Sequence, residues 1–348
     1  MKEYIEFEEL VKAIFINCGF IIGDQNKEFK AKDGSTLELD FSITENKKRY
    51  AVEVKFYRSN VPSHYYIRAI QVLKRRIVEL GFDYGVLVTS STMKESLKQE
   101  VESSGIVVID QFDLIDMASD SIELSEKLGS MLSERKAKRS SSNIQSQSAT
   151  AKIKNVQPPS SNQPLLFLNQ PPKQKDYCKE LSAIKPGRPE FSKYEKKCVE
   201  ILKYLFDSHL TGWKTQQGTG DKLNRFDLVT RVRSESDFWK FLCRELGSRY
   251  IIFEFKNYKD PIEQGEILTT EKYLHKTSLR TVAFMISRKG CSENATKFAQ
   301  GAMREHGKLI IVLEDDELCK MLKMKGEGDD PSEYLFDKVD EFLMSLPR

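Results

Sequence analysis

An acid and a base stand two residues apart inside an apolar stretch of the chain. The run Arg49–Tyr57 reads RYAVEVKFY, and in an extended strand Glu53 and Lys55 point to one face while the valines beside them point to the other. Charged side chains in a covered strand are costly unless they pair with one another or bind a metal ion. This pair therefore predicts a chemical role.

The same design occurs again in the second half of the chain. Arg249–Tyr258 reads RYIIFEFKNY and carries Glu254 and Lys256 in the corresponding places. The E-x-K spelling is weak evidence by itself, because it also occurs in four polar settings, at Glu28–Lys30, Glu45–Lys47, Glu134–Lys136 and Glu195–Lys197. Because the apolar setting occurs twice, a chemical role for the Glu–Lys pair is favoured over a solvated strand face. For either copy taken alone, a solvated face remains the competing interpretation.

Each run is preceded by two further acids at a matched spacing. Asp40 follows Glu8 by 32 residues, and Asp227 follows Glu195 by the same 32 residues. In a hairpin the aspartate can face the E-x-K glutamate, with the earlier glutamate approaching from a helix. Converging carboxylates repel one another, and a divalent cation relieves this repulsion. Oxygen ligands without a His or Cys cluster favour Mg²⁺ or Mn²⁺, so the predicted metal ligands are Asp40, Glu53, Asp227 and Glu254.

Such a constellation suits hydrolysis of a phosphodiester bond. The metal ion would activate water and hold the phosphate, while the lysine orients the nucleophile or offsets developing negative charge. The predicted catalytic residues are Asp40, Glu53 and Lys55 in the first copy and Asp227, Glu254 and Lys256 in the second, with Glu8 and Glu195 in supporting roles. The sequence leaves open whether one copy has lost its activity.

The elements that would position these residues form the same α/β pattern twice. In the first half, apolar periodicity predicts a helix over 4–18, strands over 20–30, 36–43 and 49–57, a helix over 63–80, a strand over 84–89, a helix over 93–103, a strand over 106–109 and a closing helix to about 131. In the second half it predicts a helix over 191–206, strands over 225–232 and 249–256, a helix over 265–275, a strand over 281–287, a helix over 294–306, a strand over 309–313 and a helix from 317. An insertion near 234–247 accounts for the longer distance from Asp227 to Glu254.

A change of composition separates the two copies. The chain of 348 residues is long enough for two domains with their own cores. Between them lies a stretch rich in Ser, Pro, Gln and Lys, which cannot bury enough apolar surface to become ordered. We therefore predict a first domain over 1–131, a flexible linker over 132–182 and a second domain over 183–348, each domain having a mixed central sheet flanked by helices.

The overall composition argues against several classes of protein. A formal net charge of +3 gives no global attraction for nucleic acid, so any such binding must come from local patches. The six cysteines are scattered without zinc-site spacing, and we expect them to be reduced thiols. The N-terminus does not resemble a signal peptide, and the longest apolar run is too short to span a bilayer. A cytoplasmic protein without a membrane segment is expected.

Both halves resemble the PD-(D/E)xK superfamily, also called restriction endonuclease-like. The first half is similar to its Mrr-like branch through an aromatic-Glu pair opening a helix (Phe7-Glu8), a Gly-aromatic pair ending it (Gly19-Phe20), the acid Asp40, the E-x-K motif and the G-x-L-V-T strand within Tyr84–Thr89. The second half resembles restriction endonuclease-like domains through RFDLV and EFKNY. The resemblance implies two tandem nuclease domains that use Mg²⁺ or Mn²⁺.

Two details of the resemblance concern single positions. The residue before the aspartate is Leu39 or Phe226 and not the proline of the superfamily name. Many Mrr-like members also have a glutamine in the helix after E-x-K. Gln71 and Gln264 are candidates for this supporting residue, but they stand at different distances from their lysines, so at most one is equivalent.

Local basic residues suggest the substrate. Arg68, Lys74, Arg75 and Arg76 follow the first E-x-K, and a second group comprises Arg135, Lys136, Lys138 and Arg139. Such runs are often solvated faces, but beside a nuclease site they could contact DNA phosphates, most naturally those of a duplex. Two sites per chain allow a double-strand cut by one chain or by a homodimer. By analogy, we expect a role in restriction or anti-phage defence, controlled by a regulatory partner or an activating ligand.

Two other functions compete with a DNA endonuclease. One is a nucleic-acid-binding module in which one or both nuclease sites are inactive. The other is a ribonuclease, or a nuclease effector that needs a partner or a ligand as its activator. A cleavage assay on plasmid DNA and on RNA would separate these alternatives.

Overall fold

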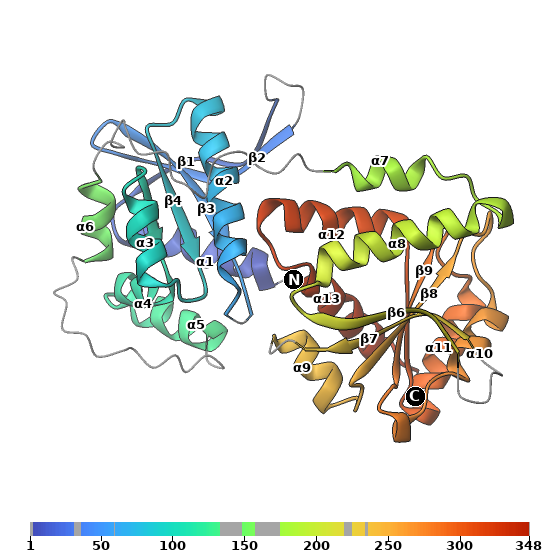
Figure 1. Cartoon of the computed structure of the whole chain (residues 1–348). Coiled ribbons are helices and arrows are strands. Elements are labelled where there is room, and N and C mark those ends of the chain that lie inside the picture. Colours follow the sequence, from blue (N-terminus) through green and yellow to red (C-terminus); the bar gives the residue numbers. More distant parts are fainter. Residues whose placement is uncertain are drawn as a thin grey trace. The chain divides into compact units, whose positions relative to one another are not determined.

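Two five-stranded mixed sheets form the frame of the chain, one in each half (Figure 1). The computed structural model describes residues 3–30, 36–58, 60–132, 148–156, 175–218, 225–233 and 236–347. The chain folds into two compact units, the first comprising Met1–Lys173 with Gly326–Asp329 and the second comprising Gln174–Lys325 with Asp330–Arg348. Each unit has a sheet and hydrophobic cores of its own.

The first sheet has the strand order β1-β2-β3-β4-β5. Its strands are β1 (Ile21–Lys30), β2 (Thr36–Glu45), β3 (Lys48–Lys55), β4 (Tyr84–Thr89) and β5 (Ile106–Ile109). The first three strands form an antiparallel meander, and the last three run parallel. This arrangement contains the predicted hairpin, which brings β2 and β3 side by side.

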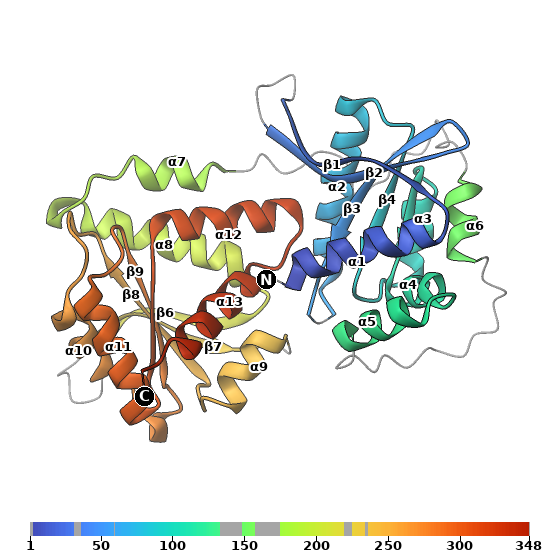
Figure 2. The same cartoon turned by 180° about the vertical axis from the view of Figure 1, so that it is seen from behind.

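Helices cover both faces of the first sheet (Figure 2). One face packs against α1 (Glu3–Asn17), α4 (Gln111–Ala118), α5 (Ile122–Leu132) and α6 (Ala149–Lys154). The other face packs against α2 (Ser63–Leu80) and α3 (Glu95–Glu102). α2 ends at Gly81, whose left-handed φ of 68° lets its N–H bond to the carbonyl of Ile77.

The second sheet repeats the first in order and direction. Its order is β6-β7-β8-β9-β10, with antiparallel pairing between the first two pairs of neighbours and parallel pairing between the last two. The strands are β6 (Leu210–Gly218), β7 (Arg225–Val232), β8 (Tyr250–Lys256), β9 (Val282–Ser287) and β10 (Leu309–Leu313). The prediction of an α/β fold with a mixed sheet in each half is thus confirmed.

The helices of the second unit also lie on both faces of their sheet. The larger core is formed with α7 (Tyr177–Ser182), α8 (Phe191–Phe206), α9 (Asp237–Arg244), α12 (Asp315–Glu327) and α13 (Pro331–Met344). The smaller core is formed with α10 (Gln264–Glu271) and α11 (Glu293–His306). Two short 3₁₀ helices cover Arg188–Glu190 and Lys276–Ser278.

Some elements differ from the sequence-based prediction. The closing helix of the first half is two helices, α4 and α5, and β6 and α13 were not predicted. β6 escaped detection because its sequence, LTGWKTQQG, is mostly polar. The predicted insertion contains α9, whose Trp239 is buried and donates a hydrogen bond to Ser332 at 2.9 Å.

The prediction of a flexible linker over 132–182 is wrong for two segments. α6 contributes Ala149 and Ile153 to the first core, and the Ile153 carbonyl accepts a hydrogen bond from the Tyr50 hydroxyl at 3.2 Å. α7 contributes Leu181 to the second core. In both segments a few apolar residues are enough to dock a short helix on a domain, which the polar average composition conceals. Leu132, at the start of the predicted linker, is the last residue of α5, and the rest of the linker apart from 148–156 and 175–182 lies outside the described residues.

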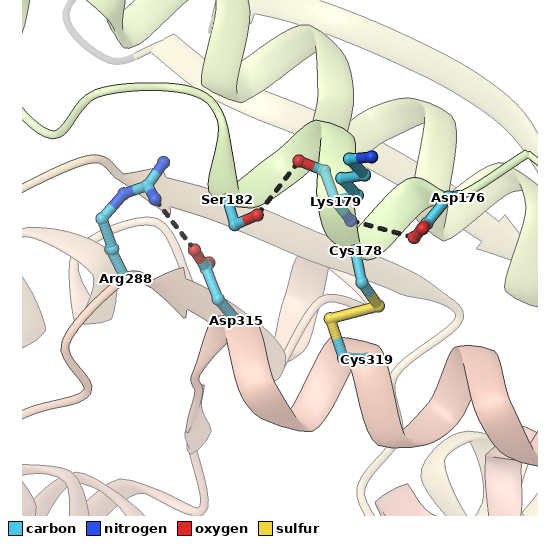
Figure 3. Close-up of a disulfide and its surroundings, with 7 residues drawn as sticks. All are labelled: Asp176, Cys178, Lys179, Ser182, Arg288, Asp315 and Cys319. Atoms are coloured by element: carbon cyan, nitrogen blue, oxygen red, sulfur yellow. Dashed lines mark hydrogen bonds and ion pairs between the residues drawn. A yellow bond between two sulfur atoms is a disulfide. The ribbon is translucent and has the colours of Figure 1, made fainter. Parts of the chain in front are cut away.

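The expectation of six reduced cysteines is wrong for one pair. Figure 3 shows Cys178 of α7 joined to Cys319 of α12 by a disulfide. The two residues are 141 positions apart in the sequence but have α-carbon atoms 5.6 Å apart, because α7 and α12 belong to the same core. The remaining cysteines, Cys18, Cys198, Cys243 and Cys291, are free thiols. None of the described helices is both long and apolar enough to cross a membrane.

Candidate active sites

In the first unit, the register of the hairpin places an aspartate opposite the E-x-K glutamate. β2 and β3 pair Phe41 with Val52, and the next position along this ladder sets Asp40 against Glu53. The Oδ2 atom of Asp40 accepts a hydrogen bond of 2.7 Å from the backbone N–H of Val54. The aspartate is therefore fixed to the backbone of the strand that carries the glutamate.

The second unit has the same arrangement at the corresponding positions. β7 and β8 pair Leu228 with Phe253, so that Asp227 stands opposite Glu254. The Oδ2 atom of Asp227 accepts a hydrogen bond of 3.0 Å from the backbone N–H of Phe255, again the residue that follows the glutamate. The backbone N–H of Asp227 in turn donates to Glu254 Oε1 at 3.4 Å.

Each lysine of the E-x-K motif pairs with the glutamate of its own strand. Lys55 Nζ lies 2.9 Å from Glu53 Oε1, and Lys256 Nζ lies 3.0 Å from Glu254 Oε2. Both glutamates are buried, as their apolar strand context predicts. The structure thus brings the predicted acid, glutamate and lysine together in both units.

Arg76 on α2 is a member of the first site that the sequence did not reveal. Its guanidinium forms an ion pair with Glu53 Oε2, and the exposed fractions of the two side chains are only 4% and 1%. Arg76 thus lies against the glutamate and not on the exposed surface of α2, and the phosphate contacts of this basic run remain a prediction. Successive helical residues point in different directions, so Arg75 is exposed and pairs with Glu79 at 2.9 Å, while burial lowers the pKa of Lys74.

Glu8 of α1 approaches the first site through Asn26 of β1. Asn26 stands opposite Asp40, and with its amide nitrogen turned inward it donates to Glu8 Oε1 at 2.8 Å and to the Asp40 carbonyl at 3.2 Å. Lys12 also pairs with Glu8, at 2.8 Å. Burial raises the pKa of Glu8, and the nearby Asp40 carboxylate adds to this effect.

Gln216 of β6 has the same place in the second unit. It stands opposite Asp227, and its Nε2 donates to Glu195 Oε1. Asn26 and Gln216 both have a left-handed backbone, with φ of 44° and 54°, which is uncommon for residues other than glycine. Neither amide was predicted from the sequence, because a positive φ at one strand position leaves no readable pattern and β6 was not predicted.

Burial dominates the electrostatics of the carboxylates. In the second unit it raises the pKa of Glu254 to about 7, with a further contribution from the Asp227 charge and an opposing one from Lys256. In the first unit burial raises the pKa of Asp40, opposed by the Lys55 charge. Burial acts to lower the pKa of Lys256, but the carboxylates of Glu254 and Asp227 outweigh it and the net pKa is raised.

A cleft opens onto the second site. Its volume is about 650 Å³, and its walls include Glu195, Gln216 and Asp227 together with Phe191 and Lys196 of α8. The supporting glutamate and the aspartate of the second unit therefore line one cavity that is open to a ligand.

The predicted glutamines are placed differently. Gln71 lies on α2 and accepts a hydrogen bond of 3.5 Å from Arg68, while Gln264 begins α10 with an exposed side chain. Within the part of the chain that the structure describes, neither glutamine forms a hydrogen bond with the carboxylates of its unit. The second basic group, Arg135, Lys136, Lys138 and Arg139, lies outside the described residues.

The donor atoms of both sites fit a hard divalent cation. Each site offers two facing carboxylates, Asp40 with Glu53 and Asp227 with Glu254. Among the described residues there is no group of three or more His, Cys, Asp or Glu side chains that could hold an ion alone. Mg²⁺ is commonly bound through one or two carboxylates, its remaining positions being filled by water and substrate phosphate. Two carboxylates per site are therefore sufficient.

Comparison with known proteins places the first unit in a functional context. Residues 3–118 match the family model Mrr_cat, described as restriction endonuclease. A protein of Escherichia coli (strain K12) named "Putative transposon gamma-delta 80.3 kDa protein" is 26% identical over 147 residues, which are 41% of this chain and 21% of that protein. The chain therefore spans about a fifth of the length of this relative.

A solved structure resembles part of the chain only remotely. The crystal structure of a protein of unknown function aligns with a TM-score of 0.25 and 17% sequence identity, covering 30% of this chain and 55% of that one. This likeness is too distant to support an argument. The family match does support one, because it includes Glu8, Asp40 and the first E-x-K motif. Residues 3–118 of the chain are thus similar to a restriction endonuclease domain.

Proposed function

We propose that the chain is a metal-dependent DNA endonuclease with one PD-(D/E)xK site in each unit. The observation that carries this proposal is the repeated geometry: in both units the aspartate accepts a backbone hydrogen bond from the residue after the glutamate, opposite it in the sheet. A solvated acid–base pair on a strand has no reason to recur with this hydrogen bond. A site that must hold two carboxylates close together does have a reason to keep this hydrogen bond, because the bond fixes the aspartate opposite the glutamate.

The residues of each site have distinct roles in this proposal. Asp40 and Glu53 would hold the cation in the first unit, as Asp227 and Glu254 would in the second. A bound Mg²⁺ or Mn²⁺ supplies an activated water and charge stabilisation at the phosphate. The lysine ammonium, fixed by its glutamate at about 3 Å, offsets negative charge that develops on the phosphate oxygens. Glu8 and Glu195, each held by a strand amide, orient groups at the edge of the site.

Double-stranded DNA is the substrate that we favour. The restriction endonuclease match of residues 3–118 supports it, and two sites per chain provide one for each strand. A homodimer that uses like units would provide the same. We further propose a role in restriction or anti-phage defence, in which a partner or an activating ligand restrains cleavage, because an unregulated nuclease would damage its host.

Cleavage of supercoiled plasmid in Mg²⁺ or Mn²⁺ tests this function. The full chain should convert supercoiled DNA to nicked or linear forms, and EDTA should stop the reaction. A variant with both Lys55→Ala and Lys256→Ala should lose this activity. Lys30→Ala is a matched control, because it removes an exposed lysine from one of the polar E-x-K runs.

Other outcomes favour the competing functions. Cleavage that survives the double substitution would rule out the proposed sites. Binding of plasmid without cleavage under all metal conditions would favour a nucleic-acid-binding module. Intact plasmid together with degraded RNA would indicate a ribonuclease.

A further inference from the structure

The two sites differ in the number of cations that meet the central glutamate. Glu53 is in contact with two, because Lys55 pairs with Oε1 and Arg76 pairs with Oε2. Glu254 meets one cation among the described residues, Lys256 at Oε2. The remaining oxygen of Glu254 has a backbone N–H at 3.4 Å. Among the described residues, the central carboxylate thus contacts two cations in the first unit and one in the second, and Lys55 is shared with Asp329 at 3.0 Å.

The second cation stands where a metal ion would have to bind. A divalent cation held between Asp40 and Glu53 needs a free oxygen on Glu53, and both oxygens already face a positive group. Arg76 is buried, and its guanidinium carries a positive charge. Two positive centres at one buried carboxylate repel each other strongly, because little water is present to screen them. Metal and Arg76 therefore compete for Glu53.

We propose that Arg76 is an internal counter-ion that keeps the first site from binding its metal tightly, so that the second site is the stronger metal site. This inference rests on the proposed function. It adds to it that the second site, and not the first, binds the catalytic metal without a prior rearrangement. The first site would bind metal once the Arg76 side chain leaves Glu53, as a ligand or DNA phosphate that attracts the guanidinium could bring about. The second site, which has a cleft beside Asp227 and no arginine on its glutamate among the described residues, needs no such release.

A purely structural role for the pair makes a different prediction. A buried ion pair can hold α2 on the sheet without any connection to metal. Removal of Arg76 would then weaken folding and leave the metal affinity of the first site unchanged. The two explanations can be separated by measuring metal binding and stability on the same variants.

The test is a calorimetric titration of the full chain with Mn²⁺. Asp227→Asn should remove the tightest binding event, leaving the first site to be measured. On that background, Arg76→Met keeps much of the side-chain length but removes the charge, and it should raise the Mn²⁺ affinity of the first site about tenfold or more, as removal of a contacting like charge typically does. Arg76→Lys retains the charge and should bind Mn²⁺ as weakly as the parent. Arg75→Met removes a neighbouring exposed charge and should also have no effect.

The outcomes distinguish failure of this inference from failure of the proposed function. If Arg76→Met is folded by circular dichroism and leaves the first-site affinity unchanged, the inference is wrong while a metal-dependent nuclease stands. The same holds if Asp227→Asn leaves the tightest event in place. Absence of Mn²⁺ binding to the parent chain and to every variant would overturn both. If Arg76→Met does not fold, the Mn²⁺ affinity of the first site is measured in Arg76→Gln on the same background, and an affinity equal to that of the parent overturns the inference.

Discussion

The two units share a backbone design but differ in what surrounds it. In both, an aspartate is bonded to the backbone N–H after the glutamate, and a strand amide holds a helix glutamate. Among the described residues, only the first unit has a buried arginine against its glutamate, and only the second unit has a disulfide. The comparison teaches that strand register fixes the position of the acids. Residues on neighbouring helices determine whether the oxygen atoms of those acids are free to bind a ligand.

This difference has a physical origin in where each residue lies. The aspartate and the E-x-K motif are fixed by one antiparallel ladder, so their mutual geometry survives large changes elsewhere. Arg76 comes from α2, which is not part of this ladder. Two sites built on the same ladder geometry can therefore differ in how readily they would bind a metal ion.

Loss of the aspartates that we propose as metal ligands should give the largest difference between the units. Asp227→Asn should reduce plasmid cleavage about 100-fold or more, because the charge that holds the cation is lost. Asp40→Asn should cost less than about tenfold, because Arg76 already keeps the first site weak. Initial cleavage rates in Mg²⁺ measure both. Equal losses would contradict the asymmetry, and a greater loss for Asp40→Asn would reverse it.

Opening the disulfide should destabilise the second unit selectively. Cys319→Ser frees the constraint between α7 and α12, which spans 141 residues, and should lower the free energy of unfolding by about 2–4 kcal/mol. Both tryptophans of the chain, Trp213 and Trp239, lie in the second unit, so urea unfolding followed by tryptophan fluorescence reports on it.

Counting thiols tests the disulfide independently of stability. In denaturant without reductant, the four free cysteines should react with a thiol reagent, and all six should react after reduction. Reaction of all six before reduction would show that the pair is open in the protein as prepared. In that case Cys319→Ser should have little effect on unfolding.

Much of the sheet and of the two acid pairs could be predicted from sequence. Strand alternation located β2, β3, β7 and β8, and antiparallel pairing then set Asp40 opposite Glu53 without further information. The 32-residue spacing between Glu195 and Asp227, which matches that between Glu8 and Asp40, located the second site, and antiparallel pairing then set Asp227 opposite Glu254. These features are local or follow from one hairpin, which explains why the sequence reveals them.

The remaining features depend on contacts between distant elements. In the sequence Arg76 is one member of a basic run, because the rotation of α2 that buries it is set by packing on the sheet. The pairing of Cys178 with Cys319 depends on two helices meeting across the core. α6 is hidden within a linker-like composition, because two buried side chains are too few to change the average of a polar stretch. Each of these needs the tertiary structure.

Burial of Glu254, only partly opposed by the Lys256 charge, should make the second unit sensitive to pH. Its folded pKa of about 7 lies above the value of about 4.5 expected when unfolded, so the folded state holds the proton more firmly. This group therefore contributes stability that is present below pH 4.5 and is lost as the pH rises to about 7. By linkage the loss is on the order of 1–3 kcal/mol.

Replacing each glutamate by glutamine tests that contribution. Tryptophan-monitored unfolding at pH 5 and pH 8 should show a smaller pH effect in Glu254→Gln than in the parent. Glu53→Gln leaves Arg76 buried without its partner, so it should lower the thermal midpoint of the first unit at both pH values. A Glu254→Gln variant with the full parental pH dependence would show that other groups cause it.

The strand amides provide the finest comparison. Gln216→Gly removes the amide that holds Glu195 but relieves a left-handed backbone, since glycine adopts φ near 54° without strain. We expect stability to be kept or slightly increased while kcat for plasmid cleavage falls about tenfold and KM changes little, as loss of an orienting contact commonly produces. Asn26→Gly makes the same change in the first unit. Because Arg76 keeps that site weak, it should leave cleavage nearly unchanged in the parent chain and lower it only once Arg76→Met is present. A loss from Asn26→Gly in the parent would mean that the first site already contributes to cleavage with Arg76 in place.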